Sequence, residues 1–410
     1  MEKRWVKGLM VALSYILVAA LACLVTIILV LPTMKYYNSY VPMREPEGEL
    51  KQNAEKLEEL LSLIEAGHIV DSDLTELTDA AAAAMLAATG DPWSSYIPAS
   101  KMVSHDEREE NAYAGIGITI NTEDISKGFL ISHVEPGGSA QKAGILAGDL
   151  IISVQGQNLV GKDIAFARGL IRGEAGTEVT VTVLRDGQTL EFTMERMQIL
   201  QPVVMGMLLE GKVGYIIITN FYSRCADETI ACIEDLVAKG ATSLLFDVRF
   251  NGGGYKSELV DLLDYLLPEG EMFRSEDYTG TVEVDTSNAS CLRMPMAVLI
   301  NQYSYSAAEF FAAVLQEYEW AFTVGEKTVG KGFYQVTIPM SDGSAVALSI
   351  GKYYTPKGVS LAEVGGLTPT IEVEVGEETQ VLIYSGLLDP MEDPQVLAAL
   401  DALEERKSGH

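Results

Sequence analysis

The pattern of hydrophobic and polar positions changes several times along the chain. Near its start lies a run of apolar and small residues from Gly8 to Leu31, and leucines at helical spacing follow. Short alternating segments broken by glycine follow from about Tyr113 to Met197, and beyond Gly211 apolar segments of strand length alternate with helical ones. Since each pattern is typical of a different structure, the sequence predicts several domains.

The run Gly8–Leu31 contains no charged residue. It is long enough to cross a hydrocarbon core of ~30 Å as a helix, whereas the apolar region of a cleaved signal peptide has ~7–15 residues. The basic residues before it are Lys3, Arg4 and Lys7. By the positive-inside rule the N-terminus stays in the cytoplasm and everything after Pro32 lies outside. Residues 1–33 are therefore predicted to be a cytoplasmic stub and a single-pass anchor in the cell membrane.

Residues 34–108 are predicted to form a linker and a helical arm. Leucine spacing predicts a helix from Glu49 to about Leu63, and a second helix is expected from about Asp73 to Ala88. The second helix is rich in alanine and offers a smooth apolar face. That face would pack either on its own domain or on a second copy of the chain, so a homodimer through the arm is one of two alternatives.

A compact, partly open β-barrel with two helices is expected over residues 109–197. Glycines separate its short strands, and the helices are expected at Ser139–Ala143 and Asp163–Ile171. The expected strands are Ile116–Ile120, Phe129–Val134, Leu150–Val154, Val179–Leu184 and Leu190–Met194.

Residues 198–380 are predicted to form a mixed α/β core. Alternation of strand-like and helical segments argues for parallel strands, while Phe333–Pro339 and Ala345–Ile350 alternate like antiparallel ones. A last helix, Asp393–Arg406, is expected in a tail of residues 381–410. The other expected elements of the core are the strands Val213–Ile218, Leu244–Val248 and Met296–Leu299 and the helices Asp227–Lys239, Ser257–Leu267 and Ser306–Tyr318.

Charge and cysteine usage exclude several classes of function. The 58 acidic side chains outnumber the 29 basic ones, and a net charge of −29 repels a phosphate backbone, so nucleic acid is not expected as a partner. Cys225, Cys232 and Cys291 form no CxxC pair and have no histidine cluster nearby. Neither a disulfide framework nor a zinc site is indicated, and no cofactor is predicted.

Two glycines stand where the first strand of residues 109–197 begins. Backbone N–H groups around them can converge on a peptide carboxylate while the peptide adds a strand to the sheet edge. The residues predicted to bind the peptide are Gly115, Ile116, Gly117 and Ile118. Alone, such a pattern is usually a tight turn. Together with Gly137–Ile151 it resembles the PDZ signature, which implies binding of protein C-termini.

Ser306 is expected at the start of a helix, where unsatisfied N–H groups and the helix dipole can stabilise an oxyanion. With Glu309 it also matches a capping box, which needs no chemistry. A serine nucleophile requires a base, and the histidines lie outside the core, so a Ser-His-Asp triad is not expected. They are His68, His105, His133 and His410.

Lys331, between Gly330 and Gly332, is the candidate base. A lysine serves if burial lowers its pKa until a neutral amine is present near neutral pH. Gln335 would share a strand face with Lys331 and hydrogen-bond its amine. The alternative for a lysine in a glycine loop is a solvated surface charge, as expected for Lys327.

A third candidate element is the buried strand that starts at Leu244 and runs into three consecutive glycines. The N–H group of Gly253 or Gly254 can supply a second oxyanion donor. The following Gly254-Tyr-Lys-Ser257 lacks the glycine spacing of a phosphate loop, so nucleotide binding is not expected.

In this order and behind a PDZ-like segment, these elements resemble the carboxy-terminal processing, or tail-specific, proteases. The likeness covers nearly everything after the apolar run. It is carried by Asp91–Tyr96, Arg172–Thr177, Asp247–Gly254, Ser306–Glu309, Gly330–Gln335, Tyr353–Gly358 and Gly366–Pro369.

The resemblance implies a role for each site residue. Ser306 is the nucleophile, Lys331 its general base and Gln335 the residue that positions the lysine. Ala307 and the glycine turn form the oxyanion hole, and Arg172 takes part in gating by the PDZ domain. The sequence departs from the family pattern at Gly252, where proline is usual, and at Thr370, where aspartate is common.

The predicted function is a membrane-anchored extracytoplasmic serine endopeptidase that captures substrate C-termini through its PDZ domain and cleaves through an acyl-enzyme. The main alternative is an inactive PDZ scaffold that binds protein C-termini. A histidine-dependent, trypsin-like PDZ protease is not favoured, because its catalytic domain would precede the PDZ domain and require a histidine in the core.

Overall fold

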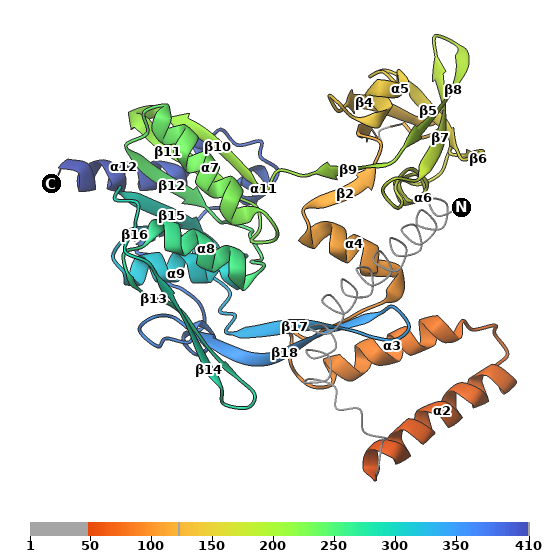
Figure 1. The fold of residues 1–410 in the computed structure, drawn as a ribbon, viewed down its shortest axis with the longest axis horizontal. Coiled ribbons are helices and arrows are strands. Elements are labelled where there is room, and N and C mark those ends of the chain that lie inside the picture. Colours follow the sequence, from red (N-terminus) through yellow and green to blue (C-terminus); the bar gives the residue numbers. More distant parts are fainter. Residues whose placement is uncertain (1–47, 122–123, 409–410) are drawn as a thin grey trace, which may run out of the picture. The chain divides into compact units, whose positions relative to one another are not determined.

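The structure, a computed structural model, describes residues 48–121 and 124–408 and is mixed α/β, as predicted (Figure 1). The predicted anchor Gly8–Leu31 lies outside the described residues. Within the described ranges, every helix is too short or too polar to span a bilayer.

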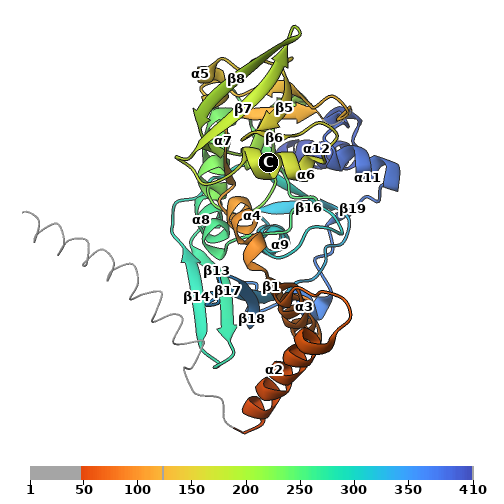
Figure 2. The same cartoon turned by 90° about the vertical axis from the view of Figure 1, so that its right-hand side faces the viewer.

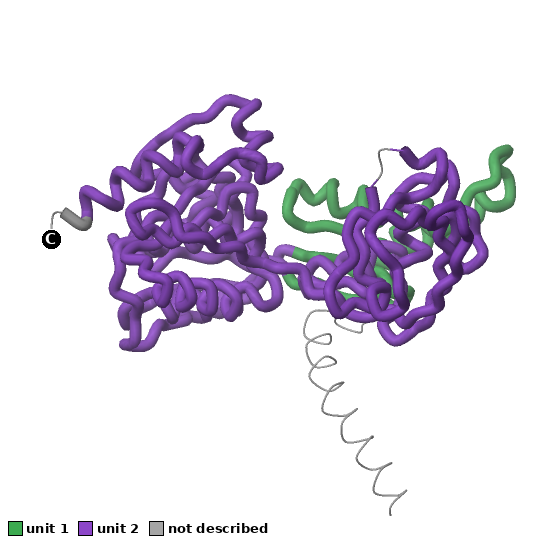
Figure 3. The backbone as a smooth tube through the Cα atoms, turned by 90° about the horizontal axis from the view of Figure 1, so that it is seen from above, with its two compact units in different colours: residues 1–98, 336–348 green, residues 99–335, 349–410 purple. Residues whose placement is uncertain are grey.

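The chain divides into two compact units, one of residues 1–98 with 336–348 and the other of residues 99–335 with 349–410 (Figure 3). In the described part of the first unit, α2 (Glu49–Gly67) and α3 (Leu74–Ala87) form the predicted arm. Asp73 caps α3 by accepting hydrogen bonds from two N–H groups of its first turn. The same unit contains β1 (Ser95–Ile97), which pairs antiparallel with the first residues of β18 (Ala345–Tyr354).

The predicted small β domain has its own sheet and core. The strand order is β3-β4-β5-β7-β8 with β6 beside β5, and β2 pairs separately with β9. Side chains such as Phe129, Ile151 and Val181 are fully buried between this sheet and two helices. The elements are β2 (Ala112–Gly115), β3 (Ile118–Asn121), β4 (Phe129–Val134), α5 (Ser139–Ala143), β5 (Leu150–Val154), β6 (Gln157–Asn158), α6 (Ile164–Ile171), β7 (Glu178–Arg185), β8 (Gln188–Glu195) and β9 (Met197–Leu200).

The structure corrects the expectation of one strand over Ile116–Ile120. β2 ends at Gly115 and β3 begins at Ile118, because Gly117 has a φ of 76° and turns the chain between them. The two strands consequently belong to different sheets.

The second unit also contains the expected parallel core sheet, in the order β10-β11-β12-β15-β16-β19. Its strands are parallel except β10, which pairs antiparallel with β11 at one edge. They are β10 (Val204–Leu209), β11 (Val213–Ile218), β12 (Ser243–Asp247), β15 (Met296–Ile300), β16 (Ala321–Gly325) and β19 (Ile371–Glu372).

Helices cover both faces of this sheet (Figures 1 and 2). On one face, residues such as Phe246 pack against α7 (Cys225–Ala238), α8 (Lys256–Leu266) and α9 (Ala307–Glu317). On the other face, the preceding residue of the strand, Leu245, packs against α12 (Pro394–Ser408). The alternation follows from the two-residue period of a strand.

The C-terminal helix was expected in a tail, yet it forms one layer of the core. Val396, Ala399 and Leu403 of α12 are fully buried. Asp393, just before the helix, accepts a hydrogen bond from the Gln395 N–H group and caps it.

Several elements had no counterpart among the predictions. β13 (Gly270–Asp277) and β14 (Val282–Ser287) form a hairpin that joins β18 and β17 (Phe333–Pro339) in a separate antiparallel sheet. The other unpredicted helices are α4 (Ala99–Glu109), α10 (Leu361–Val364) and α11 (Glu377–Tyr384).

Candidate active site

Ser306 immediately precedes α9, as its N-cap residue. Its φ of 58° and ψ of −128° are unusual for a residue with a side chain, and such backbones cost ~1–3 kcal/mol. The helix behind it lies in the core, since every residue from Ala307 to Leu315 is buried. The chain therefore turns sharply at Ser306 and presents it at the positive end of a buried helix.

A single buried carboxylate joins the serine segment to the lysine segment. Oε2 of Glu309 accepts hydrogen bonds from the Ser306 N–H at 3.3 Å and from the Lys331 N–H at 3.2 Å. Oε1 accepts from the Gly330 N–H at 3.1 Å and from the Thr328 hydroxyl at 3.3 Å. Because one oxygen atom binds both backbones, Ser306 and Lys331 are held close together.

The environment of Glu309 also shifts its ionisation. Burial raises the pKa of its carboxyl group to about 7, although hydrogen bonds from the Lys331 and Gly330 N–H groups act in the opposite direction. The capping-box pattern identified Glu309 as a partner of Ser306, but not as the link to Lys331.

The Lys331 amine meets the residue predicted to position it. Nζ of Lys331 donates to Oε1 of Gln335 at 2.7 Å. The Gln335 amide is fixed in turn, because its Nε2 donates to Oγ of Ser349 at 2.8 Å and to the Phe333 carbonyl at 3.3 Å. Lys331 precedes β17 and does not lie on that strand, yet the expected contact is present.

Tyr353, on β18, forms a second link between the two segments. Its hydroxyl donates to the Lys331 carbonyl at 2.5 Å and is also hydrogen-bonded to the Ser306 side chain. The phenol is buried, and this burial raises its pKa well above the ordinary value. Tyr353 had been assigned no role from the sequence, although it opens one of the motifs that carry the family resemblance.

The glycine turn after β12 packs directly against the serine. A Cβ atom on Gly253 would lie 2.7 Å from both the Ser306 Cβ and the Ala307 nitrogen, so a side chain has no room there. Gly253 also has a φ of 85°, which favours glycine.

The hydrogen bonds of this turn distinguish the N–H groups of its two candidate oxyanion donors, Gly253 and Gly254. The Gly253 N–H donates to Oδ1 of Asn251 at 2.8 Å, so it is already engaged. The N–H groups of Ala307 and Gly254 remain the candidates. At Gly252, where the family pattern has proline, a Cβ atom would lie 2.6 Å from the Tyr305 hydroxyl oxygen, so Tyr305 occupies the space of a larger residue.

Comparisons with known proteins show which family the chain belongs to. Residues 212–373 match the model of peptidase family S41, and residues 130–185 match a PDZ domain. The chain is 30% identical over 324 residues to the carboxy-terminal processing protease CtpA of Bacillus subtilis (strain 168), covering 78% of this chain and 69% of that one. The chain belongs to the carboxy-terminal processing protease family. It is accordingly a serine-type peptidase with a PDZ domain.

A second relative gives the same assignment. The carboxy-terminal-processing protease of Bartonella bacilliformis is 32% identical over 295 residues, which cover 69% of this protease and 67% of the relative. The solved photosystem II D1 C-terminal processing protease is 26% identical, with a TM-score of 0.44, over 78% of this chain and 88% of its own.

The PDZ domain of the protease presents an open strand at the predicted peptide site. β3, which begins at Ile118, is the edge strand of its sheet, and within residues 48–121 and 124–408 no strand pairs with its outer side. The carbonyl of Ile116 is held by the Ala140 N–H at 2.9 Å, at the start of α5. This arrangement fixes the loop of Gly115, Ile116 and Gly117 beside that edge.

Arg172, the predicted gating residue, is held by two neighbours. Its Nη1 donates to Oε2 of Glu107 at 2.7 Å, and its guanidinium lies 4.3 Å from the centre of the Tyr113 ring. Glu107 belongs to α4, so Arg172 ties the end of the PDZ helix α6 to the helix that precedes the domain.

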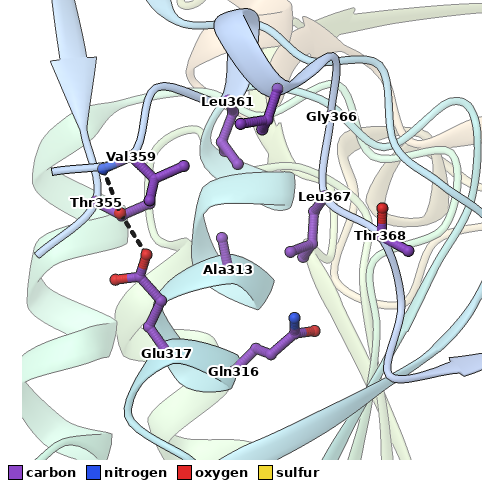
Figure 4. Close-up of a pocket in the computed structure, with 10 residues that line it drawn as sticks. Ala313, Gln316, Glu317, Thr355, Val359, Leu361, Gly366, Leu367 and Thr368 are labelled. Carbon is purple, nitrogen blue, oxygen red and sulfur yellow. Dashed lines mark hydrogen bonds between the residues drawn. The ribbon is translucent and has the colours of Figure 1, made fainter. Parts of the chain in front are cut away.

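A hollow of about 240 Å³ lies beside the second half of α9 (Figure 4). The Thr355 hydroxyl donates to Glu317 on its wall at 2.5 Å. The hollow is separate from the candidate catalytic residues. It is lined by Ala313, Gln316, Glu317, Thr355, Val359, Leu361, Val364, Gly366, Leu367 and Thr368.

Proposed function

We propose that this protease is a membrane-anchored, extracytoplasmic endopeptidase in which Ser306 and Lys331 form a catalytic dyad. The supporting observation is the shared carboxylate oxygen of Glu309, which binds the backbone N–H groups of both residues. The Tyr353 hydroxyl supports it as well, because it contacts the Ser306 side chain and the Lys331 carbonyl.

Lys331 acts in its neutral form. An amine that donates one hydrogen to Oε1 of Gln335 can turn its lone pair toward the serine hydroxyl. It accepts the Ser306 proton as Oγ attacks the scissile carbonyl carbon. Gln335 fixes the amine's orientation, so less orientational freedom is lost when the reactive geometry forms.

The N–H groups of Ala307 and Gly254 stabilise the oxyanion of the tetrahedral intermediate. Ala307 is the first residue of α9, where N–H groups have no partner within the helix. Collapse of the intermediate breaks the peptide bond. The protonated Lys331 gives its proton to the leaving amine, and water then attacks the acyl-enzyme and releases Ser306.

The PDZ domain supplies substrate selection. A disordered C-terminal segment adds a strand to the free edge of β3, and its carboxylate binds the N–H groups at Gly115, Ile116, Gly117 and Ile118. When a peptide occupies the PDZ domain, Arg172 gives up its contacts with Glu107 and Tyr113 for other contacts. The segment Gly8–Leu31 holds the enzyme in the membrane, and the arm α2–α3 provides a surface for a homodimer.

The test compares cleavage of an unstructured protein that ends in apolar residues. We expect Ser306→Ala and Lys331→Ala to abolish cleavage, while Lys327→Ala, which changes a neighbouring lysine, leaves it intact. Cleavage by Ser306→Ala would remove that residue from the mechanism. If the wild-type chain binds C-terminal peptides but neither cleaves nor reacts with a serine-directed probe, the inactive scaffold is the correct function.

The anchor is tested separately from catalysis. Removal of residues 1–33 should move the enzyme from the membrane fraction to the soluble fraction. In the full chain, a protease added outside the cell should digest the part that follows the anchor. A full chain that stays in the soluble fraction would contradict the anchoring proposal and leave the dyad untouched.

A further inference from the structure

A buried guanidinium connects the glycine turn to the C-terminal helix. Arg249 follows β12 by two residues, and its side chain is 2% exposed. Nε and Nη2 of Arg249 bind the carboxylate of Asp247, the latter at 2.6 Å. Nη1 points to the other end of the chain and donates to Oδ2 of Asp393 at 2.7 Å and to Oε1 of Gln395 at 2.8 Å.

Each partner of Arg249 has further contacts that fix its position. The Tyr215 hydroxyl donates to Oδ2 of Asp247 at 2.6 Å. Oδ1 of Asp393 caps α12 by accepting from the Gln395 N–H at 2.9 Å, and Nε2 of Gln395 donates to the Val373 carbonyl at 2.7 Å. One cation thus lies between two buried carboxylates that come from different layers of the core.

The residues after Arg249 lead directly to the serine segment. The Phe250 N–H donates to Oδ1 of Asn301 at 3.0 Å, and the Asn251 carbonyl accepts from the Tyr305 N–H at 3.2 Å. Phe250 has a φ of 60°, a strained value for a residue with a side chain, so the turn needs an anchor to keep it. Arg249 is the buried charged residue next to this strain.

We propose that Arg249 and Asp393 are positioning residues, and that their ion pair lets α12 hold the glycine turn where Gly254 can bind the oxyanion. This inference rests on the proposed function, since it takes the turn to be part of the oxyanion hole. Two buried charges compensate each other only while both are present. Loss of one partner therefore leaves an uncompensated charge beside the turn.

Asp393→Asn tests this directly. Asparagine keeps an oxygen that caps α12, but it removes the negative charge that faces Arg249. Arg249→Lys is the second variant, because lysine keeps the charge and loses the planar fork that reaches both carboxylates. We expect kcat to fall ~10-fold or more in each, below the ~10²–10³-fold loss of a whole oxyanion donor. KM and the affinity of the PDZ domain for C-terminal peptides should not change.

The control is Glu271→Gln, which breaks the ion pair between Glu271 and Arg274 on β13, where the Arg274 Nη2 lies 2.8 Å from Oε2. Active sites are counted by titration with a serine-reactive probe, so a loss of folded enzyme is not read as a loss of kcat. Hydrogen exchange of the segment Gly252–Tyr255 gives a readout that is independent of activity. It should accelerate in Asp393→Asn and Arg249→Lys and stay unchanged in Glu271→Gln.

The failure of this inference differs from the failure of the proposed function. Ser306→Ala is assayed in the same series. Cleavage by this variant would overturn the proposed dyad, whatever the ion-pair variants do. If Ser306→Ala is inactive while Asp393→Asn and Arg249→Lys retain wild-type kcat per active site and wild-type exchange, the positioning role of the ion pair is wrong.

Discussion

The Nζ atom of Lys331 lies 2.7 Å from Oε1 of Gln335. This contact gives the amine one fixed direction, and the Gln335 amide is itself fixed by Ser349. We therefore expect Gln335→Ala to lower kcat ~10²-fold by misplacing the base, with a smaller change in KM. Steady-state kinetics on a peptide substrate measures both. Wild-type kcat in this variant would show that Lys331 needs no positioning residue.

The pH dependence of the free energy of unfolding should reveal the ionisation of Glu309. Its folded-state pKa of about 7 lies above the unfolded value of 4.5, so the folded state binds more protons between these values. Its contribution to the free energy of unfolding is present below pH 4.5 and is lost as the pH rises to about 7. The loss is on the order of 3 kcal/mol.

Denaturant titrations of the wild type and of Glu309→Gln at several pH values measure that contribution. The wild type should lose stability relative to the variant as the pH rises through this window, because glutamine does not titrate. Parallel pH profiles for the two proteins would contradict the shifted pKa of Glu309.

A side chain at Gly253 should displace the nucleophile. Gly253→Ala places its Cβ 2.7 Å from the Ser306 Cβ, and we expect at least ~10²-fold slower reaction with a serine-directed probe. Gly280→Ala is a matched control, since Gly280 has a φ of 83° against 85° at Gly253 but open space around its Cβ position. Equal probe rates in the two variants would contradict the displacement of Ser306 by a side chain at position 253.

The PDZ site is tested by peptide binding to an inactive Ser306→Ala background. Gly117→Val should weaken binding of peptides with a free C-terminal carboxylate, because Gly117 has a φ of 76° and a Cβ there would lie 3.1 Å from the Glu135 Cβ. Gly187→Val has the same φ of 76° in open space and should bind normally. Equal affinity for amidated and free peptides would argue against carboxylate recognition.

Local patterns in the sequence predicted most of the fold. The strands β11 and β17 begin and end at the predicted residues, and α5 does as well. Gly117 was harder to interpret, since its positive φ splits a segment whose hydrophobic pattern reads as one strand. The hairpin β13–β14 escaped prediction, and four of the six residues of its second strand are exposed.

The sequence predicted the residues of the candidate site only where they belong to a recognisable motif. Ser306, Lys331 and Gln335 come from such motifs. The roles of Tyr353 and Glu309 depend on how β18 and the lysine segment close on α9, which no local pattern encodes. Likewise, a helical pattern at residues 393–406 shows an amphipathic helix, but not that Asp393 reaches Arg249 across the core.

The rate at which a serine-directed probe acylates Ser306 tests the dyad most directly. Lys331→Met keeps the length of the side chain and removes the base, and Lys327→Met is the control, because the Lys327 amine donates to the Val364 carbonyl instead. We predict a loss of at least ~10²-fold for Lys331→Met, the range of general-base catalysis, and a wild-type rate for Lys327→Met. Equal labelling of Ser306 in Lys331→Met and the wild type would contradict the account.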